Sequence, residues 1–185
     1  MKNKEFITGK VPITKEEVRA ISISSLELEK AEKMIDIGAG TGSISIEAAL
    51  KHPNLSVTAI ERNDDALELI EKNKEKFDLN NIEIVKGYAP IELKEKYDAV
   101  FIGGTGKKLD EILDWVYEII NDGGRVCANF IIIDTFNKAV KAFKEKGFKD
   151  IDVSMVSVSK LEKLGSGEFF KPNNPVFVIS CRKGN

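Results

Sequence analysis

Three glycines at alternate positions, in the stretch D-I-G-A-G-T-G-S from Asp36 to Ser43, have the spacing that most clearly indicates chemistry. Gly38, Gly40 and Gly42 let the backbone turn sharply and let a ligand approach it closely. Dinucleotide-binding proteins usually carry G-x-G-x-x-G, in which the third glycine serves a pyrophosphate. Because the spacing here is G-x-G-x-G, the loop favours S-adenosylmethionine over NAD as the cofactor.

An acidic side chain follows the next apolar stretch, where a cofactor ribose would lie. The β-prone residues Ser56–Ile60 lead into Glu61, and a carboxylate at that point can accept hydrogen bonds from both ribose hydroxyls. Taken alone, such a glutamate would be a solvated loop residue, and the glycines could form a tight turn without a ligand. Together, the two features predict a nucleoside-containing cofactor.

The segment K-G-Y-A-P, from Lys86 to Pro90, lies where such proteins usually hold adenine. Tyr88 stands where an aspartate commonly accepts the exocyclic amine. We therefore expect backbone groups around Tyr88 and Ala89 to hold the base, with a plain turn before Pro90 as the alternative.

A second glycine cluster, G-G-T-G, follows the apolar stretch that ends at Ile102. The target atom of a methyl transfer would lie here, and Gly103 and Gly104 leave room for a bulky substrate. A base-amino methyltransferase would carry a D/N-P-P-F/Y motif at this point, and none is present. Methylation of a cytosine carbon would need a cysteine in a loop after a strand, whereas Cys127 and Cys181 lie in apolar runs.

Several polar side chains could hold an acidic substrate, although each alone is more often a solvated surface residue. They are Lys171, Asn173 and Asn174 near the C-terminus, together with Lys15, Arg19, Lys107 and Lys108. His52, the only histidine, comes just before Pro53 and is expected to end a helix. The catalytic residues are therefore left unassigned.

The composition limits the protein to one domain, residues 1–185, with 42% hydrophobic residues and a net charge of −2. Interspersed charges give no broad basic face for nucleic acid. With no C-x-x-C motif or Cys/His cluster, Cys127 and Cys181 are expected to be small core residues, and no metal site is predicted. No apolar run is long enough to cross a membrane, so we expect a soluble, cytoplasmic protein.

Strands and helices alternate along the chain, which predicts a doubly wound α/β sheet. A capping box from Thr14 to Glu17 predicts a helix that ends near Glu29. Apolar runs such as A-V-F-I are typical of parallel strands that are covered on both faces. The expected strands are Lys33–Ile37, Val57–Glu61, Ile82–Lys86, Tyr97–Ile102, Gly124–Ile133, Asp150–Ser159 and Pro175–Cys181. The other expected helices are Ser43–Lys51, Asp64–Phe77, Leu109–Ile120 and Thr135–Glu145.

After Ser159 the alternation stops. The residues L-E-K-L-G-S-G-E-F-F-K-P-N-N predict a long polar loop, and Pro175–Cys181 then returns as a strand without an intervening helix. We therefore expect an antiparallel hairpin at the end of a mostly parallel sheet. This arrangement resembles that of Rossmann-like methyltransferases.

Four stretches together resemble the decarboxylating cobalt-precorrin carbon-15 methyltransferases, which act on cobalt-precorrin-6B in anaerobic cobalamin biosynthesis. They are P-I-T-K-E-E-V-R (Pro12–Arg19), the glycine loop (Asp36–Ser43), I-G-G-T-G (Ile102–Gly106) and F-F-K-P-N-N-P-V (Phe169–Val176). The resemblance implies a class I S-adenosylmethionine-dependent methyltransferase with a seven-stranded sheet. It further implies methylation of a tetrapyrrole ring carbon, loss of carbon dioxide from a neighbouring acetate arm, and a homotetramer.

The resemblance also implies which residues contact S-adenosylmethionine, with the N-terminal helical segment 1–30 contributing to that site. These residues are Thr14, Gly38, Ala39, Gly40, Thr41, Gly42, Glu61 and Ala89. The substrate contacts are predicted from the residues themselves, and they are Gly103, Gly104, Lys171, Asn173 and Asn174. Two alternatives stay open: a class I methyltransferase for another acceptor, such as a protein carboxylate or an RNA base, and a cofactor-binding regulator without enzymatic activity.

Overall fold

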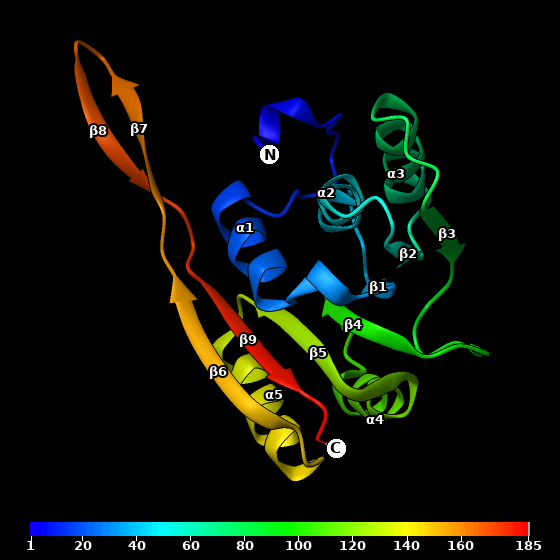
Figure 1. Ribbon diagram of the computed structural model, residues 1–185. Coiled ribbons are helices and arrows are strands. Elements are labelled where there is room, and N and C mark those ends of the chain that lie inside the picture. Colours follow the sequence, from blue (N-terminus) through cyan, green and yellow to red (C-terminus); the bar gives the residue numbers. More distant parts are fainter. Residues whose placement is uncertain (185) are drawn as a thin grey trace.

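A seven-stranded sheet forms the centre of the protein in the computed structural model, which describes residues 1–184. Its strands are β1 (Lys33–Ile37), β2 (Ser56–Glu61), β3 (Ile82–Lys86), β4 (Tyr97–Ile102), β5 (Ile120–Phe130), β6 (Lys149–Val156) and β9 (Val176–Arg182). Their order across the sheet is β3-β2-β1-β4-β5-β9-β6. The pairs from β3 to β5 are parallel, and β9 is antiparallel to both β5 and β6. The expected mostly parallel sheet with an antiparallel end is confirmed (Figure 1).

Helices cover both faces of this sheet. They are α1 (Glu16–Ser25), α2 (Ser43–Lys51), α3 (Asp64–Lys76), α4 (Leu109–Ile119) and α5 (Ile133–Glu145), with short 3₁₀ turns at Asn3–Glu5 and Leu28–Lys30. Figure 1 shows α1, α2 and α3 on one face and α4 and α5 on the other. The sequence sets these helices locally, as α3 illustrates: the side chain of Asn63 accepts the Ala66 N–H at 3.0 Å, and acidic residues follow in the first turn.

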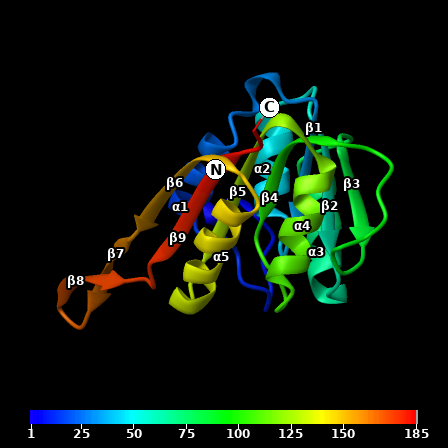
Figure 2. The same ribbon diagram turned by 90° about the horizontal axis from the view of Figure 1, so that it is seen from below.

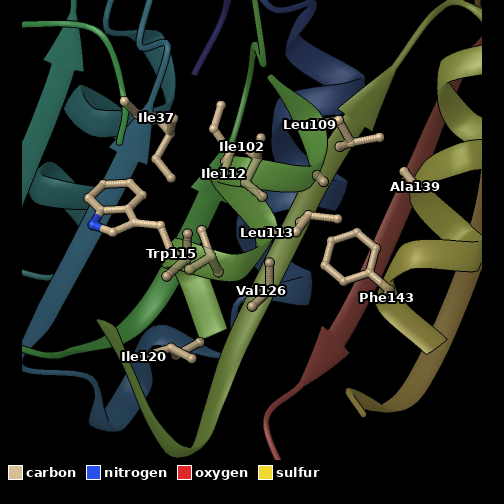
Figure 3. Close-up of a cluster of buried hydrophobic side chains, with 14 of the residues drawn as sticks. Ile37, Ile102, Leu109, Ile112, Leu113, Trp115, Ile120, Val126, Ala139 and Phe143 are labelled. Atoms are coloured by element: carbon tan, nitrogen blue, oxygen red, sulfur yellow. The ribbon is translucent and has the colours of Figure 1, made fainter. Parts of the chain in front are cut away.

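The core consists of two layers, one on each face of the sheet, because successive strand residues point to opposite faces. On one face Ile37, Leu113 of α4 and Phe143 of α5 belong to one buried apolar cluster (Figure 3), and the last two are fully buried. On the other face Met34 packs with residues of α1 and α2. This double coverage accounts for the continuous apolar strands. Both cysteines are free and buried in the core, as expected.

The segment after β6 differs from the expected polar loop. It forms a second, two-stranded antiparallel sheet of β7 (Ser159–Leu164) and β8 (Gly167–Pro172), which projects away from the rest of the protein (Figures 1 and 2). Every residue of both strands is exposed. Because neither face of this small sheet is covered, its strands lack the apolar alternation that marks a half-buried strand, and the sequence did not predict them.

Several expected element boundaries are also wrong. Lys15, not Thr14, is the N-cap of α1, and no side-chain cap is present. Glu17 pairs with Lys160 of β7 and does not reach back to the helix start, while α1 ends at Ser25. The strand expected to reach Ile133 ends at Phe130, so an isoleucine run lies outside the sheet.

His52 is the C-cap of α2, as expected, and its backbone N–H donates to the Ala48 carbonyl at 3.0 Å. Within residues 1–184, no helix combines the length and the apolarity that crossing a bilayer requires.

Candidate active site

The glycine loop between β1 and α2 lies against the loop that follows β4. Gly38 and Gly42 have φ angles of +71° and +73°, a region that side chains rarely adopt. A Cβ atom at Gly38 would also lie 3.0 Å from the backbone nitrogen of Gly104. Gly38 is therefore required for two reasons: its positive φ angle and the close approach of the two loops.

Glu61 stands at the end of β2 and is bonded to this loop. Its Oε2 accepts the Gly40 N–H at 2.8 Å, and its Oε1 accepts the N–H groups of Arg62 and Asn63 at 2.7 and 2.9 Å. These amides fix the carboxylate in the cleft wall. Because Oε2 has one such partner and Oε1 has two, Oε2 is the better placed acceptor for a ribose hydroxyl.

Both features line one cleft of about 180 Å³ at the carboxyl ends of β1, β2 and β4, which we call the cofactor cleft. The expected adenine residues lie on its wall: Tyr88 lines it, and Ala89 is buried beside it. The Tyr88 hydroxyl donates to the Gly106 carbonyl. The Arg62 guanidinium carbon and Lys108 Nζ each lie 4.8 Å from the centre of the Tyr88 ring.

Asp36 is a fully buried carboxylate immediately before the glycine loop. Its Oδ2 accepts the Ser45 hydroxyl at 2.6 Å, and among residues 1–184 Oδ1 has no hydrogen-bond partner. Burial raises the pKa of Asp36 to about 7, and the negative charge of Glu61 adds to this, although hydrogen bonds from Ser45 oppose it. Sequence reasoning assigned Asp36 no role, although a lone charge within an apolar strand was the available signal.

These observations fit S-adenosylmethionine. The loop approaches its neighbour as closely as only glycine allows, Oε2 of Glu61 accepts only one backbone N–H and has capacity for a ribose hydroxyl, and Oδ1 of Asp36 is buried beside the loop without a partner among residues 1–184. The residues that would hold this cofactor are the glycine loop, Glu61 and the Tyr88–Ala89 segment.

Thr14 lies across the strand ends from these residues, in a neighbouring cleft of about 290 Å³. That cleft is lined by Pro12, Ile13, Thr14, Lys15, Val18, Gly103, Asn129, Ile131 and Val176. Gly103 belongs to the loop that adjoins the cofactor cleft, so the N-terminal segment reaches the same edge of the sheet. The role expected for Thr14 stays a prediction.

Arg19 does not face a substrate, contrary to expectation. It is fully buried, and its Nε donates to Oε2 of Glu47 at 2.6 Å. Its remaining donors reach the carbonyls of Thr14 and Met1 and the Asn3 side chain, at 2.6, 2.8 and 2.9 Å. Arg19 therefore ties the N-terminal segment, including the Thr14 backbone, to α2.

The expected substrate residues lie in two separate places. Gly103 and Gly104 lie beside the cofactor cleft, and a Cβ at Gly104 would have no neighbour within 4 Å. Lys171 lies on the projecting hairpin and pairs with Glu162 at 3.1 Å. The Asn174 carbonyl accepts Lys15 Nζ at 3.2 Å, and the Asn173 N–H donates to Val158. Whether this second group contacts substrate stays a prediction.

A family model described as the precorrin methyltransferase domain matches residues 5–183. The chain belongs to this family. The expected class I methyltransferase fold is likewise confirmed, since a crystal structure of precorrin-6y C5,15-methyltransferase from Geobacter metallireducens superposes with a TM-score of 0.91. The two chains are 39% identical, and the match covers 99% of this chain and 97% of the other.

Two further similar proteins have names that state a function. The cobalt-precorrin-6B C(15)-methyltransferase (decarboxylating) of Salmonella typhimurium is 47% identical over 99% of this chain and 96% of its own length. The crystal structure of precorrin 8W decarboxylase from Methanobacterium thermoautotrophicum has a TM-score of 0.88 at 29% identity, covering 98% of each chain.

Proposed function

We propose that this protein transfers a methyl group from S-adenosylmethionine to carbon 15 of cobalt-precorrin-6B and removes carbon dioxide from the neighbouring acetate arm, in cobalamin biosynthesis. Membership of the precorrin methyltransferase family supports this, as does the name of the relative from Salmonella typhimurium. The observation that carries the proposal is the contact between the Gly38 loop and Gly104. It brings a cofactor loop directly against an open surface that can receive a large, flat acceptor.

When bound, S-adenosylmethionine would supply a methyl group on a positively charged sulfur. Glu61 would hold the ribose, the Tyr88–Ala89 segment would hold the adenine, and Thr14 would contact the cofactor from the neighbouring cleft. The N-terminal segment, held by Arg19, would complete the site. The role of each of these residues would be to bind and orient the cofactor beside Gly104, which lines the same cleft.

The chemistry needs little from the protein beyond this alignment. An electron-rich ring carbon can attack the methyl group itself, so no strong base is required. In the decarboxylation, the bond between the arm and its carboxylate breaks, its electrons pass into the conjugated ring, and a proton replaces carbon dioxide. Cationic and amide side chains then serve to hold the carboxylates of the substrate.

We also infer that the protein acts in the cytoplasm as a homotetramer. Exposed apolar side chains on the projecting hairpin support self-association: Leu161, Leu164 and Phe170 are 55%, 68% and 68% exposed. Light scattering after size exclusion would test this, and a monomeric mass would contradict it.

The decisive experiment supplies cobalt-precorrin-6B and methyl-labelled S-adenosylmethionine to the purified protein. The expected product gains one labelled methyl group and loses one carbon dioxide. Methylation of RNA or of protein carboxylates, with the precorrin left untouched, would support the alternative acceptor class. Tight cofactor binding without turnover of any acceptor would support the regulator.

A further inference from the structure

Three consecutive isoleucines stand exposed where β5 gives way to α5. Ile131, Ile132 and Ile133 are 65%, 60% and 61% exposed, although isoleucine is among the residues most often buried. A run of exposed apolar residues on a monomer costs solubility and commonly marks a binding surface. The position of this run, beyond the last residue of β5, places it at the same sheet edge as the glycine loops.

Ile131 and Ile132 line a cleft of about 460 Å³, which we call the acceptor cleft. Leu109 and Phe130 add to its apolar side. The acceptor cleft shares Gly104 and Gly106 with the cofactor cleft. A ligand that packs on the isoleucines therefore extends to the two glycines that also line the cofactor cleft.

The polar part of the acceptor cleft favours anions. Lys107 and Lys138 line it together with Thr135 and Asn129, and no aspartate or glutamate is among the described residues that line it. This excess of basic over acidic side chains is specific to the acceptor cleft, because the whole chain has 30 acidic and 28 basic residues. The N-cap of α5 is Ile132, which provides no side-chain cap, so the first amides of the helix add positive potential.

We propose that Ile131 and Ile132 form the platform on which the flat apolar face of the acceptor packs, and that Lys107 and Lys138 pair with carboxylates at its rim. This inference rests on the proposed function and assigns the acceptor site within it. The ligand class is a planar macrocycle with several carboxylates, because apolar area and cations lie side by side in one cleft. The platform is distinct from Lys171 on the hairpin.

Uroporphyrin I, a flat polycarboxylate porphyrin, is the probe, and its fluorescence reports binding in the presence of saturating S-adenosylhomocysteine. We expect Ile131→Ser and Ile132→Ser each to weaken uroporphyrin binding roughly tenfold, since a large apolar contact is lost. Lys138→Gln should weaken it several-fold and reduce its salt dependence. Calorimetry should show unchanged affinity for S-adenosylhomocysteine in all three variants, because the cofactor cleft is untouched.

Two matched variants act as controls. Met155→Ser removes an apolar side chain on β6 that is 63% exposed, and Lys141→Gln removes a charge on α5 that pairs with Glu145 at 3.6 Å. Both should bind uroporphyrin like the unmodified protein. Equal weakening by the controls would overturn the platform, because the effect would then follow from general surface polarity.

Turnover of cobalt-precorrin-6B separates this inference from the proposed function. If the unmodified protein methylates the precorrin, the isoleucine variants should show a raised KM with a smaller change in kcat. Unchanged uroporphyrin binding and unchanged KM in these variants would overturn the platform and leave the proposed function standing. The same conclusion would follow if the substitutions changed only the mass of the oligomer. Failure of the unmodified protein to methylate the precorrin would overturn the proposed function itself.

Discussion

The backbone N–H of Gly40 donates to Oε2 of Glu61 at 2.8 Å, so the glycine loop and the end of β2 hold each other in place. Glu61 orders the glycine loop through this bond, and under the proposed function it would also offer an acceptor to the ribose of the cofactor. A substitution at this position removes both contributions together.

Glu61→Ala should weaken S-adenosylhomocysteine binding by about 2–4 kcal/mol, since ribose hydroxyls lose a charged acceptor and the Gly40 amide loses its partner. Calorimetry measures this, and far-ultraviolet circular dichroism should show an intact fold. Glu68→Ala on α3, which removes an exposed partner of Lys72, is the control and should leave binding unchanged. Cofactor binding of normal strength in Glu61→Ala would show that Glu61 is not the ribose ligand.

Gly104→Val should abolish turnover while cofactor binding persists. A Cβ atom at Gly104 would meet no atom within 4 Å, so we expect the fold to tolerate valine, whose side chain would occupy the space where the ring carbon must approach. The measurements are product formation and S-adenosylhomocysteine affinity. Gly167→Val, on the exposed hairpin strand β8, is the control. An active Gly104→Val enzyme would show that the acceptor does not cross this loop.

Asp36 should make the protein less stable as the pH rises from about 4 to about 7. Its folded-state pKa is raised from 3.8 to about 7, so in this window the native state holds a proton that the unfolded state has lost. The free energy of unfolding then falls by at most about 1.4 kcal/mol per pH unit for this one group. Burial raises the pKa of Glu47, but hydrogen bonds from Arg19 and Lys51 outweigh it and hold the value at about 2, so Glu47 adds little slope above pH 5.

Urea titrations of the unmodified protein and of Asp36→Asn between pH 4 and 7 measure this contribution. The difference between the two stabilities should change with pH in the direction given, whereas Asp65→Asn, at an exposed position in the first turn of α3, should follow the unmodified protein. Parallel stability curves for Asp36→Asn and the unmodified protein would mean that folding does not raise the pKa of Asp36.

Arg19→Met should destabilise the protein by about 3–5 kcal/mol, because it leaves the carboxylate of Glu47 buried with fewer cations. Glu47 is 1% exposed and pairs with Arg19, with Lys51 and with the Met1 ammonium group. The matched variant Lys51→Met removes a partner that is 50% exposed and should cost less than about 1 kcal/mol. Thermal unfolding compares the two, and equal losses would contradict the dominant role of Arg19.

Much of this architecture follows from short-range sequence patterns. The glycine spacing, Glu61 and the continuous apolar strands each depend on neighbours within a few residues, so they could be predicted. The burial of Arg19 could not, because its partner Glu47 lies on another helix and only folding brings the two together. Nor could the loop position of Ile131, since β-branched residues in a row resemble a buried strand.

The hairpin of β7 and β8 could not be predicted for another reason. Its residues are exposed on both faces, so hydrophobic periodicity carries no signal, and only the Gly165 turn with its φ of +60° marks the reversal. The candidate site was predicted best where backbone conformation determines the residue, and least where distant side chains meet.

The contact between Gly38 and the Gly104 backbone also limits how this enzyme can be redesigned. Variants with a longer Gly103–Gly106 loop, made to admit a different acceptor, would also displace the glycine loop that contains Gly38. Ile131 and Lys138 follow β5, the next strand of the sheet, so we expect substitutions there to leave the glycine loop in place. Efforts to change acceptor choice should therefore begin at the end of β5 and leave the loop after β4 as it is.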